Sequence, residues 1–374
     1  MAYKITPAGV YTQLYSFKGG PSDIQYPLGL IQGSDGNFWG MGNQGGAVNG
    51  DGGVFKLTPT GTEALVYSFK GGTDGQNPYT SLIQGSDGNY YGTTEGSGGN
   101  SLGTVFQLTP KGVETVLYNF PDQTEGAFPR LPLTQGPNGL LYGIATDCPG
   151  GGCAQAGLFD ITTKGAYANL YLYPIIGGNN NELPYSPLLL STNGTFYSVT
   201  EGGGSHQVGS FYSVSTTFAP FVSLVTTAGK ETAKIGILGQ GFKSTSVVKF
   251  GGVQATSVTG SATFLSAAVP AGALTGKVTV TTGATTLTSD TTFRVKPTMA
   301  SFSPPSGAVG AAVTVTGTSL TQATKVTFNG TSASFVVNSD TKITATVPTG
   351  ATTGKIGVTT KGGSASSATT FTVN

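Results

Sequence analysis

Acidic side chains recur together with aromatic rings at four places in the first half of the chain. Each acidic residue stands shortly before a proline that has an aromatic neighbour. The acidic residues are Asp23, Asp74, Glu125 and Glu182, and the aromatic residues are Tyr26, Tyr79, Phe128 and Tyr185. Rings stack on the CH faces of sugars and carboxylates accept hydrogen bonds from hydroxyls, so this pattern predicts a carbohydrate-binding surface. The structural alternative is that the rings fill repeat junctions and the acids cap turns.

Catalytic groups are scarce in this sequence. The single histidine, His206, lies in a glycine-rich stretch that does not preorganise a base, which disfavours Ser-His-Asp and Cys-His chemistry. Glu95 and Glu201 are the candidates for a carboxylate pair that hydrolyses glycosides, although nothing in their spacing selects them. A non-catalytic binding protein is therefore favoured. A glycoside hydrolase or polysaccharide lyase that uses carboxylate or tyrosine residues of the same face is the alternative.

Two cysteines, Cys148 and Cys153, are separated by a short glycine-rich stretch. They can approach disulfide distance, which predicts a disulfide that pins a loop in an oxidising compartment, with free thiols as the alternative. The His and Cys clusters that transition metals require are absent from the sequence, and no cofactor is expected. Calcium at residues 49–52 is a weaker alternative, because no ligands alternate along that stretch.

Composition and charge indicate a folded chain with two kinds of surface. The 374 residues include 60 Gly and only 18 Lys/Arg and 17 Asp/Glu, but the 20 Phe and 16 Tyr lie in periodic segments that disorder does not explain. Residues 1–220 hold 7 basic and 14 acidic residues, whereas residues 221–374 hold 11 and 3. No apolar run is long enough for a membrane span, no basic block suggests nucleic acid, and the first residues form no secretory signal.

Three motifs recur in step four times, at intervals of 51–55 residues. Tyr15–Phe17 returns as Tyr67–Phe69, and the Asp35–Gly36 turn returns as Asp87–Gly88. Apolar runs that alternate with Asp-Gly and Thr-Pro turns predict four short strands per repeat and no helix. Four strands per repeat is typical of a β-propeller blade. We expect four blades, with five as the alternative, and a ring that closes if the N-terminal hairpin supplies the outer strands of the last blade.

A second repeat, with a period of 78 residues, follows. Gly239, Phe250 and Phe293 return 78 residues later as Gly317, Phe328 and Phe371. About seven short strands per copy indicate a small immunoglobulin-like β-sandwich, present twice. The predicted all-β chain therefore has three domains: a β-propeller at 1–220 and β-sandwiches at 221–296 and 297–374.

Both repeats resemble known families. Residues 67–110, with Tyr-Ser-Phe, Asp-Gly-Asn and Val-Phe-x-Leu-Thr-Pro, best match the pattern of the GloVer tandem repeat and so resemble that family, which is found in exported bacterial proteins. The second repeat resembles IPT/TIG domains, whose Pro-x-x-Gly entry stands at 304–307. The resemblance implies an exported bacterial protein, secreted or at the cell surface, and brings no catalytic residues with it.

The sequence predicts a protein that binds a polysaccharide or surface glycan on the propeller face with the long loops, and whose sandwiches are spacers. Function concentrates on such loops. A monomer is expected. Head-to-tail self-assembly is the alternative, because the two halves carry opposite charge and the N-terminal hairpin is unpaired.

Overall fold

The computed structural model describes residues 1–47, 49–96, 102–121, 126–145, 156–173, 184–206, 208–215 and 218–374. Within these ranges the structure is built from β-strands with one short 3-10 helix, η1 (Gly72–Asp74), which confirms the predicted all-β class. The chain forms two compact units, Met1–Thr217 and Phe218–Asn374, called here the repeat unit and the sandwich unit. The predicted domain limits at 220/221 and 296/297 stay predictions.

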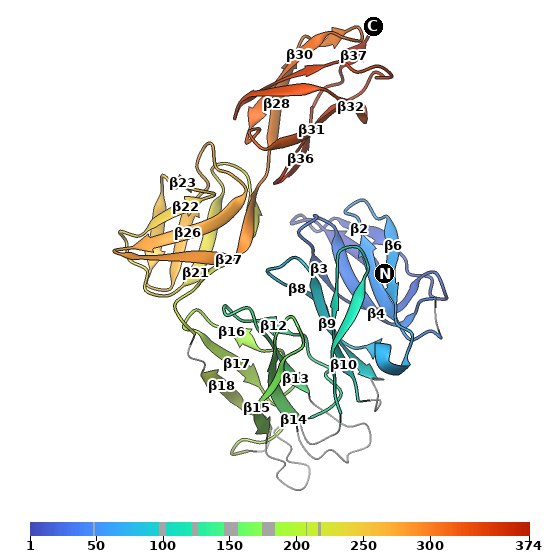
Figure 1. Ribbon diagram of the computed structural model, residues 1–374, viewed down its shortest axis with the longest axis vertical. Coiled ribbons are helices and arrows are strands. Elements are labelled where there is room, and N and C mark those ends of the chain that lie inside the picture. Colours follow the sequence, from blue (N-terminus) through green and yellow to red (C-terminus); the bar gives the residue numbers. More distant parts are fainter. Residues whose placement is uncertain are drawn as a thin grey trace. The chain divides into compact units, whose positions relative to one another are not determined.

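The repeat unit contains a hairpin and four successive antiparallel sheets (Figure 1). The hairpin is β1 (Ala2–Ile5) and β2 (Tyr11–Tyr15). The first sheet is β3 (Ile24–Gln32), β4 (Phe38–Gly45), β5 (Gly53–Leu57) and β6 (Glu63–Ser68). The second is β7 (Gln76–Pro78), β8 (Ile83–Gln84), β9 (Tyr90–Gly96), β10 (Thr104–Leu108) and β11 (Glu114–Asn119). The third is β12 (Thr134–Gln135), β13 (Leu141–Ala145), β14 (Ala156–Ile161) and β15 (Tyr167–Tyr173), and the fourth is β16 (Leu189–Leu190), β17 (Thr195–Val199) and β18 (Phe211–Ser215).

Tight turns join neighbouring strands on one face of the repeat unit. Gly36 and Gly88 have φ of 84° and 87°, a conformation that costs glycine little and explains the predicted Asp-Gly turns. Successive turns are also linked, because the Gln84 side-chain oxygen accepts a hydrogen bond from the Ser34 amide at 2.7 Å. The Gln135 side chain repeats this bond to the Ser86 amide at 2.8 Å. We call this side the short-turn face.

The first sheet packs on the second, and the second on the third, through a pair of phenylalanines. Phe69, which follows β6, meets Phe106 of β10 with ring centroids 5.2 Å apart, and Phe120, which follows β11, meets Phe159 of β14 at 5.6 Å. Phe55, Phe69, Phe106, Phe120 and Phe159 are all fully buried. The regular array of apolar strands predicted by the repeat is therefore held by one recurring contact.

The N-terminal hairpin does not take the place expected for it. Strand β1 pairs with β2 alone, and in the described part of the chain neither strand pairs with the fourth sheet. The hairpin instead packs on the first sheet, where Phe17 meets Phe55 with centroids 4.8 Å apart. The same kind of phenylalanine contact joins the first sheet to the second and the second to the third. The hairpin thus precedes the first sheet as a partial blade, and the four predicted blades follow it.

The long loops lie together on the opposite face, as expected. The loop between β4 and β5 meets the loop that enters β3, because the Gly46 amide donates to the carbonyl oxygens of Gly20 and Asp23, each at 3.0 Å. Strand β7 of the second sheet joins them, since the Asn77 amide donates to the Asp51 carbonyl oxygen at 2.8 Å. We call this side the long-loop face.

The sandwich unit contains two β-sandwiches, as predicted (Figure 1). The first is β19 (Val222–Leu224), β20 (Ala228–Gly229), β21 (Lys234–Gly239), β22 (Val247–Phe250), β23 (Val253–Gln254), β24 (Val258–Ser261), β25 (Phe264–Ala268), β26 (Gly276–Thr282) and β27 (Thr285–Val295). The second is β28 (Thr298–Ser303), β29 (Ser306–Gly307), β30 (Ala312–Thr318), β31 (Ala323–Phe328), β32 (Thr331–Ala333), β33 (Phe335–Ser339), β34 (Lys342–Thr346), β35 (Ile356–Thr360), β36 (Gly363–Ser366) and β37 (Thr372–Val373).

The two sandwiches repeat each other in side-chain detail. Phe250 and Phe293 meet edge to face at 5.0 Å in the first core, and Phe328 and Phe371 do the same at 5.0 Å in the second. In both copies a buried serine hydroxyl accepts a backbone amide hydrogen bond, at 3.0 Å in the first and 3.1 Å in the second. The 78-residue period of the sequence therefore preserves core packing.

Candidate functional site

Asp23 and Asp74, two of the predicted ligand-binding acids, hold the loops on which they lie. Asp23 is 3% exposed, and one carboxylate oxygen accepts hydrogen bonds from the Lys18 amide at 2.7 Å and the Tyr15 hydroxyl at 2.9 Å. Asp74 accepts the same two kinds of bond, from the Lys70 amide at 2.7 Å and the Tyr67 hydroxyl at 2.5 Å. These bonds fix the entry into the first and second sheets.

A second carboxyl group lies beside each of these tyrosines. Oε2 of Glu114 is 3.5 Å from the Tyr67 hydroxyl. Burial and the neighbouring Asp74 raise the pKa of Glu114 to about 7, and burial and Asp23 raise that of Glu63 to about 7. Burial, with the Asp23 carboxylate, also raises the pKa of Tyr15 to about 12. A partly buried carboxyl pair therefore lies at each of two junctions of the repeat unit: where the hairpin packs on the first sheet, and where the first sheet packs on the second.

The four predicted aromatic residues occupy two different repeat positions. Tyr26 and Phe128 precede a proline and share an unusual φ of 52°, whereas Tyr79 and Tyr185 follow one. Tyr26 and Tyr185 are 61% and 70% exposed, and Tyr79 is also exposed. Asn77 holds the position of Tyr26 in the second sheet with the same φ, 51°. The left-handed backbone is thus a property of the repeated loop and not of an aromatic residue.

Tyr26 borders a hollow on the long-loop face. The hollow has two adjoining parts, of about 580 and 310 Å³, which share Gly20 and Gln25. Gln25 and Gln44 face each other across β3 and β4. Both residues are exposed, and their side chains form no hydrogen bond within the described part of the chain. The other polar side chains that line the larger part are Asn49, Asp51 and Asn77.

The second sheet lies against the larger part of this hollow. Nδ2 of Asn77 donates to the Asn43 carbonyl oxygen at 3.2 Å, and Nδ2 of Asn43 donates to the Pro78 carbonyl oxygen at 3.0 Å. This reciprocal pair joins the loop of the second sheet to β4 of the first. The result is a concave, polar surface with fixed walls, in which amide and carboxylate groups surround open space and one ring stands at the rim. We call it the loop hollow.

The sequence predicted the loops of this site better than its side chains. Tyr26 was predicted and lines the hollow, whereas Gln25, Gln44 and Asn77 were missed. A signal existed, because Gln25 returns as Gln76 one repeat later. The opposition of Gln25 and Gln44 depends on strand register, which the sequence does not state.

The two carboxylates proposed for catalysis are not brought together by any contact in the described residues. Glu95, at the end of β9, forms an ion pair with Arg130. The Arg130 guanidinium also lies over the Tyr79 ring, 5.4 Å from its centroid. Glu201 is exposed beyond the end of β17, and exposed His206 contacts the Ser205 hydroxyl at 3.0 Å. Between the second and third sheets, Glu95 is therefore already engaged in an ion pair.

Several predicted features fall outside the described residues. They are Glu125, Glu182, Cys148 and Cys153, so the two acids and the disulfide stay predictions. Among the described residues there is no group of three or more His, Cys, Asp or Glu side chains that could hold a metal ion. Those residues also include no helix long and apolar enough to cross a membrane.

The fold defines an all-β repeat protein in which blade-like sheets precede immunoglobulin-like sandwiches. The chain belongs to the Gloeobacter/Verrucomicrobia repeat family, whose family model matches residues 1–212. An IPT/TIG domain matches residues 297–373. Both resemblances drawn from the sequence are therefore confirmed. No curated protein matches the chain.

Solved structures show weak likeness to this chain. One is SGBP-B from a xyloglucan utilization locus of Bacteroides uniformis, 22% identical, with TM-score 0.21 over 41% of this chain and 50% of that one. Another is the surface glycan-binding protein PbSGBP-B of Prevotella bryantii, 20% identical, with TM-score 0.30 over 42% and 40%. PorZ, a surface component of the type-IX secretion system of Porphyromonas gingivalis, is 14% identical, with TM-score 0.37 over 96% and 53%. The matches span half or less of the two glycan-binding proteins, and at these TM-scores no functional argument rests on them.

Proposed function

We propose that this chain is an exported bacterial surface protein that binds a glycan, without catalysis, in the loop hollow, with the two sandwiches as spacers. The observation that supports the proposal is the composition of the hollow. One exposed ring, Tyr26, stands beside the unengaged amides of Gln25 and Gln44 around a cavity large enough for several sugar rings.

The chemistry of the hollow favours a sugar over an apolar ligand. Side-chain amides both donate and accept hydrogen bonds, as vicinal hydroxyls do, and a carboxylate such as Asp51 accepts two more. A tyrosine ring offers a flat apolar surface to the CH face of a pyranose. Asp23 and Asp74 serve the site indirectly, because their bonds to Tyr15 and Tyr67 fix the loops that form its walls.

A glycan array with the full chain tests the proposal, followed by titration calorimetry with the glycan that binds best. The double variant Tyr26→Ala, Gln25→Ala should bind at least tenfold more weakly, because it loses a stacking surface and an amide. Phe264→Ala removes an exposed ring of the sandwich unit and should leave binding unchanged. Separate Tyr79→Ala and Tyr185→Ala variants measure whether the other predicted rings contribute.

Two outcomes would refute the proposed site. Binding that survives the Tyr26, Gln25 double variant would move the site elsewhere, and an array without any bound glycan would remove the function. The same polysaccharides are incubated with the protein and examined for new reducing ends or unsaturated products, which would instead support the enzymatic alternative.

A further inference from the structure

The hairpin and the first three sheets of the repeat unit meet at three junctions. At each one, the last strand of a sheet covers a tyrosine on the last strand of the preceding sheet or hairpin. Glu114, the first residue of β11, lies against Tyr67 of β6. Tyr167, the first residue of β15, stacks on Tyr118 of β11 with centroids 3.9 Å apart and planes within 3°. Glu63 of β6 holds the same place beside Tyr15 of β2. In each case the residue that lies against the tyrosine is the first residue of the last strand of its sheet.

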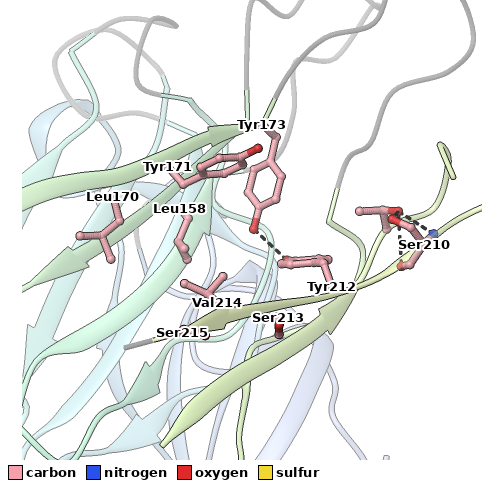
Figure 2. Close-up of a pocket in the computed structure, with 10 residues that line it drawn as sticks. Leu158, Leu170, Tyr171, Tyr173, Ser210, Tyr212, Ser213, Val214 and Ser215 are labelled. Carbon is pink, nitrogen blue, oxygen red and sulfur yellow. Dashed lines mark hydrogen bonds between the residues drawn. The ribbon is translucent and has the colours of Figure 1, made fainter. Parts of the chain in front are cut away.

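Tyr171 of β15 is the next tyrosine in this series, and no strand of the described residues covers it in this way. It is 51% exposed, and its neighbours Leu170 and Leu172 are exposed as well. A groove of about 430 Å³ lies between β15 and β18 (Figure 2). One wall carries Tyr171 and Tyr173, and the other carries Tyr212, whose hydroxyl is 2.9 Å from that of Tyr173.

The groove lies where the fourth strand of the fourth sheet would stand. In the described residues β18 pairs with β17 alone, whereas the equivalent strand β10 pairs on both sides. The sequence of β18, Phe-Tyr-Ser-Val-Ser, contains no charge and no proline, the residues by which sheet edges avoid pairing. The edge is therefore suited to accept a strand.

Strand β2 has the features of the strand that would fit. Aligned by the repeat, Tyr11 holds the place of Glu63, Glu114 and Tyr167, and it is 50% exposed. Its partner in the hairpin is Ile5, just as Leu108 is the partner of Glu114. Because Val214 of β18 is the repeat equivalent of Ile5, β18 can replace β1 at the edge of β2. The resulting register sets Val214 opposite Tyr11 and Ser213 opposite Thr12.

We propose that β2 of a second copy of this chain completes the fourth sheet, with its Tyr11 stacked on Tyr171 as Tyr167 stacks on Tyr118. Within its own chain, β2 remains packed on the first sheet through Leu14 and Phe17. The completed sheet of one copy would thus be followed directly by the first sheet of the next. Such a contact joins two different surfaces, so it closes into a ring or extends as a filament.

Cross-linking between two single-cysteine chains tests both the partner and the register. In a background with Cys148→Ser and Cys153→Ser, the Ser213→Cys chain is mixed with the Thr12→Cys chain at high protein concentration under mild oxidation. We expect a covalent dimer of about twice the 37.8 kDa chain mass. The matched control is Gln13→Cys, one residue along the same strand, whose side chain points to the other face of the sheet and should cross-link at least tenfold less.

A second measurement uses the unmodified chain. Light scattering across a concentration series should show a mass above 37.8 kDa that Tyr11→Ala lowers by weakening association about fivefold to tenfold. Fluorescence of Trp39, the single tryptophan, confirms that each variant is folded. Equal cross-linking by Thr12→Cys and Gln13→Cys, or a monomer at every concentration, would overturn the proposal. A chain with cysteines at both 12 and 213 that cross-links only within itself would assign the groove to its own hairpin and overturn it too.

Discussion

At the first two junctions of the repeat unit the tyrosine is covered by a glutamate, whereas at the third it is covered by an aromatic ring. The hairpin and first sheet meet at Tyr15, and the first and second sheets meet at Tyr67; a glutamate and an aspartate flank each tyrosine. The second and third sheets meet at Tyr118, where Tyr167 replaces the glutamate and stacks on the ring. The backbone position is the same in all three.

This difference shows which part of a repeat is fixed by packing and which part varies. All three junctions pack a phenylalanine against a buried phenylalanine of the next sheet. The residue that covers the tyrosine changes between carboxyl and ring without changing the strand pairing. Only the first two junctions should therefore respond to pH.

We expect the largest effect from removing the phenylalanine that the junctions have in common. Phe69→Ala and Phe120→Ala each remove a fully buried ring and should each lower the free energy of unfolding by about 3–5 kcal/mol. Urea denaturation followed by Trp39 fluorescence measures both losses, because this single tryptophan lies in the repeat unit. Costs that differ by more than about 2 kcal/mol would show that the junctions do not share one packing design.

The next largest effect is a pH dependence of the free energy of unfolding, which we expect from the first two junctions and not from the third. Because the pKa values of Glu63 and Glu114 are raised to about 7 in the folded chain, both favour the protonated state there. Their contribution to stability is complete below the unfolded value of about 4.5 and is lost as pH rises through about 7. After allowance for solvent screening, the loss should be on the order of 1 kcal/mol for each glutamate.

Glutamine variants measure this effect. Glu114→Gln should reduce the decline in unfolding free energy between pH 4.5 and 8 by about half, and the double variant with Glu63→Gln should remove it. Tyr167→Glu should add a decline of similar size by giving the third junction the chemistry of the first two. A decline that persists in the double glutamine variant would assign the pH dependence to other groups.

A smaller effect concerns Asp74, the partner of Glu114. Asp74→Asn weakens the hydrogen bonds from Tyr67 and the Lys70 amide and should cost about 1 kcal/mol at pH 5. It also removes the negative charge that helps to raise the pKa of Glu114. The cost should therefore shrink at pH 8, where ionised Glu114 no longer faces a second carboxylate. Urea denaturation at the two pH values checks this, and an equal cost at both would contradict it.

The sequence predicted the periodic parts of the molecule well, because turns and apolar alternation are local signals. The Asp35–Gly36 turn and its copies mark the sheets, and the phenylalanine pairs of the sandwiches follow from the period of 78 residues. The place of the hairpin was predicted wrongly. Ring closure was made conditional on the hairpin supplying the outer strands of the last blade, and in the described residues β1 and β2 pair only with each other.

The candidate site was less predictable because it depends on contacts between distant residues. Asp23 looked like a ligand residue, yet it receives the Tyr15 hydroxyl. The repetition of that pair as Tyr67 and Asp74 was a signal for a structural role. Gln25 returns as Gln76 in the next repeat, but no local signal places it beside Gln44, because only the pairing of β3 with β4 does so. A local sequence motif does not show which residues of two strands lie opposite each other, because that depends on strand register.

The smallest effect distinguishes the short-turn ends of the sheets. In the first sheet the Lys56 ammonium lies 3.4 Å from Asp35 and 5.3 Å from the centroid of the Trp39 ring. In the third sheet Asn138 holds the place of Asp35 and donates a hydrogen bond to the Tyr142 hydroxyl, and Asp160 holds the place of Lys56. Lys56→Ala should lower the free energy of unfolding by only about 0.5 kcal/mol, because the ion pair is open to water. The loss should disappear in 1 M NaCl, which screens exposed charges. Asn138→Ala, the matched variant of the third sheet, breaks an uncharged bond, so its cost should be the same with and without salt. A Lys56→Ala cost that salt leaves unchanged would mean that packing of the lysine stem on Trp39, and not its charge, stabilises this end of the sheet.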